Sequence, residues 1–99
     1  MIDAFETPVS VARAVAERAK QRRTAMRLTQ AELAQKAGLS LSAYRRFEQS
    51  GQIAFTSLLQ VAFALDCMGD FNALFAGTSW ATMDDMLKQA KPAKRVRHD

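Results

Sequence analysis

Two short helical segments separated by a turn that contains a glycine constrain the fold of this chain more than any other feature of its sequence. Thr29 is a favourable N-cap for a helix that starts directly after it. We expect that helix to be only two turns long, because it stops at Gly38, and a residue without a Cβ suits the left-handed conformation that often ends a helix. A second short helix is predicted to open at Ser40 and to end near Ser50 and Gly51.

The second of these helices is predicted to have an inner and an outer face. Tyr44 and Phe47 lie three residues apart in the stretch LSAYRRFEQ and are expected to point inward, since residues three or four apart share a helix face. The side chains left facing outward are those of Leu41, Ser42, Arg45 and Arg46.

Together the two segments meet the physical requirements of a helix-turn-helix unit, in which two short helices cross at a turn that often contains glycine. The first helix is small on its inner face, at Ala34 and Ala37, so the two helices can pack closely. Gly38 relieves the turn, and Leu39 is expected to fill the space between the helices. In such a unit the N-terminal part of the second helix reaches base edges in the major groove of DNA.

The segment before this unit predicts one long helix. Thr7 resembles an N-cap, and Pro8 suits the first helical position, so we expect a helix from there to about Met26. Its predicted inner stripe consists of Val11 or Ala12, Val15, Ala19, Arg22 or Arg23, and Met26.

The segment after the unit predicts further helices, because Pro and Gly fall between the periodic stretches and nothing alternates at period two. Thr56 is expected to cap a fourth helix, with Leu58, Val61, Ala62 and Leu65 at core spacing. A short fifth helix is expected from about Asp70, with Gly77 ending it. We therefore predict an all-α, five-helix domain over residues 8–77, an additional helical extension over 78–90, and a basic flexible tail over 91–99.

Composition narrows the classes of protein that this sequence fits. The chain has 99 residues with one Cys and one His, too few for a disulfide within the chain or for the four ligands of a structural zinc site. No nucleophile pattern, glycine-rich phosphate loop or metal-ligand cluster can be assembled, so we expect neither an enzyme nor a cofactor. The N-terminus has no basic patch before an apolar run, which predicts a cytoplasmic, nucleoid-associated protein.

Charge is unevenly distributed along the sequence. The formal net charge is +4, but residues 13–46 alone carry +7, whereas residues 47–90 carry −4. Such segregation favours a surface for a polyanion such as nucleic acid, although a basic segment can also be a simple solvated face.

The stretch from Arg23 to Ser40, with its TQAELAQKAG core and a following Phe-Glu pair, resembles the XRE family, the Cro and phage-repressor type of helix-turn-helix. The resemblance covers about residues 15–76. The later stretch YRRFEQSGQIAFTSLLQVAFAL, followed by FNALF, is similar to the HipB-type antitoxin subgroup. That similarity implies a dimeric, DNA-binding autorepressor that also restrains a HipA-type kinase.

The family pattern also implies roles for individual residues. It places phosphate contacts at Gln30 and Ser40, and it pairs Arg23 with Glu48 as a partly buried structural ion pair. Base-edge contacts fall to Leu41, Ser42 and Arg46, because Arg can donate two parallel hydrogen bonds to guanine. The remaining expected DNA contacts, mostly to phosphate, come from Thr29, Arg45, Thr56 and Ser57.

Several alternatives stay open at the level of sequence. Two residues separate Glu48 from Gly51 where phage repressors usually have one, so the backbone that places Gln52 and Ile53 can follow another path to DNA. The function is either a dimeric autorepressor and antitoxin, a stand-alone repressor, or an adaptor that mainly restrains a partner kinase. Three aromatic residues are expected in the core or in a dimer interface: Phe63, Phe71 and Phe75. Cys67 is expected to be a small buried hydrophobe. An alternative interface for a partner protein consists of Trp80, Met83 and Met86.

Overall fold

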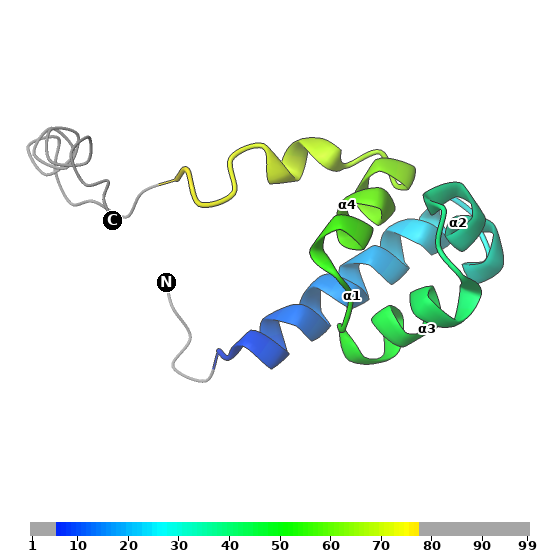
Figure 1. The fold of residues 1–99 in the computed structure, drawn as a ribbon, viewed down its shortest axis with the longest axis horizontal. Coiled ribbons are helices and arrows are strands. Elements are labelled where there is room, and N and C mark those ends of the chain that lie inside the picture. The colour runs from blue at the N-terminus through cyan, green and yellow to red at the C-terminus, as the bar shows by residue number, and fades with distance from the viewer. Residues whose placement is uncertain (1–5, 78–99) are drawn as a thin grey trace, which may run out of the picture.

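The structure is a computed structural model that describes residues 6–77. Over this range the chain forms α1 (Pro8–Ala25), α2 (Gln30–Ala37), α3 (Leu41–Ser50), α4 (Phe55–Ala64) and a short 3₁₀ helix, η1 (Met68–Phe71). Helix α1 crosses the molecule, with α3 along one edge and α2 and α4 on its other sides (Figure 1). The predicted extension over 78–90 and the basic tail lie outside the described residues.

The start of α1 confirms the predicted cap. The Thr7 hydroxyl accepts a hydrogen bond from the Ser10 backbone N–H at 3.0 Å, and the Thr7 backbone N–H donates back to the Ser10 hydroxyl at 2.9 Å. Pro8 takes the first helical position, where its missing N–H costs nothing.

The predicted inner stripe of α1 is only partly right. Ala16, Ala19 and Arg23 are the buried residues of the helix, whereas Val11 is 41% exposed. Met26 is 40% exposed because it is already the C-cap, beyond the last helical turn. The small alanine side chains allow close approach to the rest of the domain, and Val15, a predicted member of the stripe, is half-buried and packs against the core.

The helix-turn-helix segment follows the prediction closely. Thr29 and Ser40 cap α2 and α3 through their side chains, and the helices end at Gly38 (φ +75°) and Gly51 (φ +82°) in the left-handed conformation. Leu39 is half-buried and packs against the core as expected. The fully buried larger side chains of the domain are Leu33, Tyr44, Phe47 and Val61.

Helix α4 differs from the prediction at its start. Its N-cap is Ala54, which offers no side-chain hydrogen bond, and the predicted cap, Thr56, lies inside the first turn. The first N–H groups of a helix can be satisfied by water when they face solvent, so a capping side chain is not obligatory. Val61, Ala62 and Leu65 are buried as predicted, and Leu58 is half-buried.

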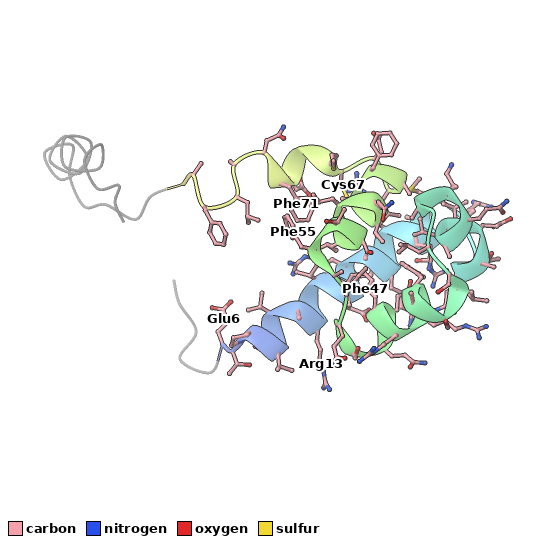
Figure 2. The ribbon with its side chains drawn as sticks, in the orientation of Figure 1. Glu6, Arg13, Phe47, Phe55, Cys67 and Phe71 are labelled. Atoms are coloured by element: carbon pink, nitrogen blue, oxygen red, sulfur yellow. The ribbon has the colours of Figure 1, made fainter. Side chains whose placement is uncertain are left out.

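The predicted fifth α-helix is wrong. Residues after α4 form η1 and then a series of turns, whose backbone hydrogen bonds span three residues, such as Leu74 N–H to Phe71 at 3.1 Å and Ala76 N–H to Ala73 at 2.9 Å. A short helix needs tertiary packing to form. Only Phe71 is half-buried here, against Phe55 with ring centroids 6.3 Å apart (Figure 2), whereas Phe75 is 97% exposed.

Candidate nucleic-acid interface

Helix α3 has the two faces that its sequence predicts. Tyr44 and Phe47 are 0% exposed and anchor the helix in the core, where Phe47 lies between the helices (Figure 2). Ser42, Arg45 and Arg46 are exposed on the opposite side. Leu41, expected to face outward, is instead half-buried.

The angle between α2 and α3 is fixed by the turn that joins them. The Leu39 N–H donates to the Ala34 carbonyl at 2.9 Å, and the Gly38 N–H donates to the Gln35 carbonyl at 3.1 Å. These bonds satisfy the last carbonyls of α2, and the half-buried Leu39 side chain holds the turn against the core. These contacts thus hold the outer face of α3 in a fixed orientation relative to α2.

The carboxylate of Glu48 connects three helices beneath that outer face. The Arg23 guanidinium of α1 binds it with two hydrogen bonds, Nε to Oε2 at 2.7 Å and Nη2 to Oε1 at 3.1 Å. The Gln30 amide of α2 donates to Oε1 at 2.9 Å, and the Tyr44 hydroxyl of α3 donates to Oε2. The two side chains of this ion pair are 9% and 4% exposed, and Arg23 also donates to the Leu28 carbonyl at 2.8 Å.

This arrangement keeps Glu48 ionised. Burial by itself would raise the pKa of the carboxyl, but hydrogen bonds from Arg23, Tyr44 and Gln30 outweigh it, so the pKa of Glu48 lies below its ordinary value. The pKa of Tyr44 is raised, first by burial and then by its bond to the carboxylate. Tyr44 is therefore a neutral hydrogen-bond donor at physiological pH.

Gln30 continues this network to the surface. Its amide nitrogen donates to Glu48, and its amide oxygen accepts a hydrogen bond from Arg45 Nε at 3.3 Å. The Gln30 amide, which is predicted to contact phosphate, is thus already oriented by Glu48 and Arg45. One of its two N–H bonds stays available, because an amide nitrogen carries two donors.

The capping hydroxyls of Thr29 and Ser40 are also oriented. Thr29 Oγ1 accepts from the Glu32 N–H at 3.0 Å, and Ser40 Oγ accepts from the Ala43 N–H at 3.1 Å. Ser40 Oγ also lies 3.4 Å from Ser42 Oγ. Each hydroxyl keeps a proton that it can donate to a phosphate oxygen.

At the other end of α3 the structure brings Arg46 together with Gln52. Arg46 Nη2 donates to Gln52 Oε1, and both side chains are exposed. Gln52 is not among the DNA contacts that the sequence predicts. The one sequence signal that bears on Gln52 is the pair of residues between Glu48 and Gly51, and α3 extends through that pair to Ser50.

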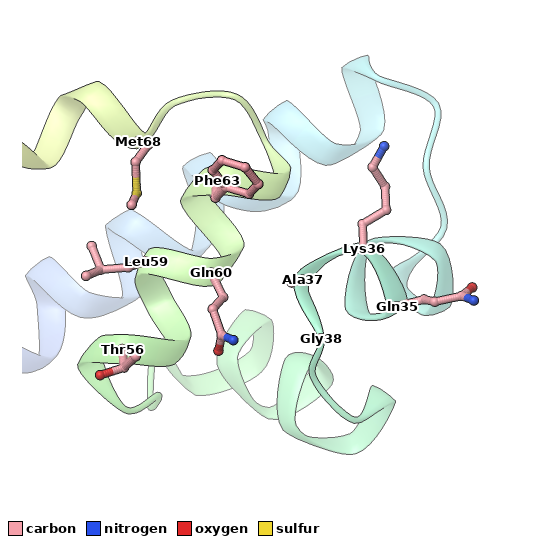
Figure 3. A pocket seen from close by; sticks show the side chains of 9 residues that line it. All are labelled: Gln35, Lys36, Ala37, Gly38, Thr56, Leu59, Gln60, Phe63 and Met68. Atoms are coloured by element: carbon pink, nitrogen blue, oxygen red, sulfur yellow. The ribbon is translucent and has the colours of Figure 1, made fainter.

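The two residues expected to contact DNA from the start of α4 differ in their exposure. Thr56 is exposed and lines a shallow, open groove between α2 and α4, together with Gly38 and Gln60 (Figure 3). Ser57 is half-buried. Gln35 and Lys36 of α2 also line this groove.

The other residues that the sequence analysis singled out add no polar group to the outer face of α3. Phe63 is 73% exposed and Phe75 is 97% exposed, so they do not belong to the core of the single chain. Cys67 is half-buried, and burial raises the pKa of its thiol. Trp80, Met83 and Met86 lie outside the described residues.

Among residues 6–77, no three or more His, Cys, Asp or Glu side chains gather as metal ligands would. None of the helices in the same range is both long enough and apolar enough to cross a membrane.

Four helices with a glycine turn between α2 and α3, and an exposed polar face on α3, define a helix-turn-helix DNA-binding domain. Residues 20–67 match the helix-turn-helix family model HTH_3. This chain therefore carries an XRE-type helix-turn-helix domain, a class that binds DNA sequence-specifically and is typically not enzymatic. No curated protein matches the chain.

Proposed function

We propose that the protein is a transcriptional repressor that binds a pseudo-palindromic operator as a homodimer and controls its own promoter. The observation that carries this proposal is the outer face of α3. Three polar side chains, Ser42, Arg45 and Arg46, are exposed there, while Tyr44 and Phe47 on the inner face are completely buried. A helix anchored in this way can enter the major groove without rearranging the core.

The exposed side chains divide into two groups by what they can bind. Arg46 offers parallel donors that match the O6 and N7 atoms of guanine, and Ser42 can bond several bases. Leu41, half-buried, still has surface to place against a thymine methyl group. The phosphate group comprises Thr29, Gln30, Ser40 and Arg45, with Thr56 and Ser57 of α4 as a further clamp.

A dimer is proposed because one recognition helix reads only a few base pairs. Two copies that face the same side of the duplex would read half-sites about 10 base pairs apart, or a multiple of that spacing. Exposed apolar side chains on and after α4, Phe63 and Phe75, are suitable for the contact between copies.

The proposal is tested by selecting the protein against a pool of randomised DNA duplexes and then measuring affinity for the enriched sequence at several salt concentrations. If each subunit neutralises about four phosphates, log affinity falls against log salt with a slope of about −7 for the dimer. Arg46→Ala should relax base preference at one position per half-site, whereas Gln30→Ala should weaken all sequences alike. No enriched sequence, together with a slope near zero, would reject the proposal.

A second role is supported by the sequence similarity to HipB-type antitoxins, which extends from Tyr44 to Phe75. In this role the protein also binds and restrains a HipA-type kinase, with Trp80, Met83 and Met86 as its contact residues. Co-expression with a kinase encoded by the adjacent reading frame tests this: the complex should co-purify, and Trp80→Ala should release the kinase without loss of DNA binding. Failure to co-purify would leave a stand-alone repressor.

A further inference from the structure

Gln52 follows the glycine that ends α3, and its side chain turns back along the helix. The amide oxygen of Gln52 accepts a hydrogen bond from Arg46 Nη2, across six residues of sequence. Both residues are exposed, so burial does not force this contact.

Two further hydrogen bonds hold the backbone of Gln52 in place. Ser50 Oγ donates to the Arg46 carbonyl at 2.7 Å and accepts from the Gln52 N–H at 3.1 Å. The Ser50 hydroxyl therefore bridges the backbones of the two residues whose side chains meet.

Gly51 fixes the direction of the chain between them. Its φ is +82°, and a Cβ at this position would lie 2.7 Å from the Ala12 carbonyl carbon of α1. Because the turn is pressed against α1, Gln52 leaves α3 in a defined direction. The turn at Gly51 thus brings Gln52 to Arg46.

The contact leaves the guanidinium free to bind a base. Arg46 has five N–H bonds, and Nη2 carries two of them. One Nη2–H goes to Gln52, so the second Nη2–H and a neighbouring N–H still form the parallel pair that guanine O6 and N7 accept.

We propose that Gln52 is a positioning residue that sets the base specificity of Arg46. The inference rests on the proposed DNA-binding function and adds a residue to it. A free arginine side chain loses rotamer freedom when it binds a base, and this loss weakens binding. Gln52 removes part of that freedom before binding and favours the orientation that matches guanine.

The test is a double-mutant cycle on base discrimination. Affinities are measured for the duplex enriched by the wild-type protein and for the same duplex with the base pair read by Arg46 exchanged. The proteins compared are the wild type, Gln52→Ala, Arg46→Ala, the double variant and, as a control, Gln35→Ala, which removes an exposed amide from α2. Thermal unfolding of each variant is recorded alongside.

We expect Gln52→Ala to lower discrimination at that base pair by about threefold to tenfold without changing the unfolding temperature. In the Arg46→Ala background the same substitution should have no further effect, because Gln52 acts through Arg46. Ser50→Ala should give a smaller loss in the same direction, and Gln35→Ala none.

Two results would overturn the inference while leaving the proposed function intact. Gln52→Ala could keep the discrimination of the wild type, or it could lose the same factor with and without Arg46, which would make Gln52 an independent contact. If the wild-type protein enriches no sequence, the proposed function fails, and the role of Gln52 fails with it.

Discussion

Glu48 links three helices through one carboxylate. Arg23, Gln30 and Tyr44 belong to α1, α2 and α3, and each donates to this group. These donors stabilise the buried carboxylate, since an unpaired buried charge is costly. The orientation of the recognition helix therefore depends on a residue that has no predicted contact with DNA.

The first prediction concerns this carboxylate. Glu48→Gln should lower the free energy of unfolding by about 3 kcal/mol, because the Arg23 charge is left buried without its partner. Urea denaturation measures this. Glu17→Gln, at an exposed position of α1, is the control and should change the stability by less than about 0.5 kcal/mol. Equal effects of the two substitutions would show that the buried pair does not stabilise the fold.

The second prediction is a dependence on pH. The pKa of Glu48 is lowered in the folded state, so its stabilisation is present above the ordinary value of 4.5 and is lost as the pH falls through the folded-state pKa. Tyr44→Phe removes one donor and should cost about 1 kcal/mol at neutral pH. The difference in unfolding free energy between wild type and variant should narrow below about pH 4.5. A constant difference across this range would assign Tyr44 a packing role alone.

At the scale of elements, the two helix-ending glycines differ in what surrounds them. Gly51→Ala should destabilise the domain by at least about 2 kcal/mol, because a positive φ is combined with a Cβ placed 2.7 Å from the backbone of Ala12. Gly38→Ala should cost only about 1 kcal/mol, because the nearest atom to its Cβ would be Gln60 Nε2 at 3.8 Å. Denaturation curves compare them, and a larger loss for Gly38→Ala would refute this account of the turns.

The elements that sequence predicts well are those that local chemistry determines. Thr7, Thr29 and Ser40 cap their helices, and Gly38 ends α2, because these features depend on a few neighbouring backbone groups. The alternation of inner and outer residues on α3 is equally local, since helical periodicity alone separates Tyr44 from Arg45.

The structural features that the residue pattern does not predict depend on tertiary contacts. The segment from Asp70 to Gly77 has apolar residues at helical spacing, but only Phe71 among them is half-buried, and the α-helix does not form. The hydrogen bonds of Gln52 with Arg46, and of Gln30 with Arg45, join residues on different elements or across a turn. Their geometry follows from the path of the backbone, which a residue pattern does not specify.

At the scale of the whole molecule, the polar face of α3 and the exposed apolar side chains on and after α4 are carried by separate elements. If the proposed dimer forms through these apolar side chains, Phe63→Asp should shift the protein towards the monomer and weaken binding to a two-half-site duplex by at least about tenfold, without lowering stability. Sedimentation and DNA titration measure these effects. Val9→Asp, at a position on α1 that is 61% exposed, is the control. An unchanged oligomeric state would reject Phe63 as part of the proposed dimer contact.

The role of α3 in reading DNA is tested by mapping backbone amide chemical shifts by NMR as an enriched duplex is added to the protein. We expect the largest changes at residues 40–52 and at Gln30, with smaller changes along α1. Changes concentrated around Phe63 on α4, with residues 40–52 unaffected, would contradict the claim that α3 is the element that reads DNA.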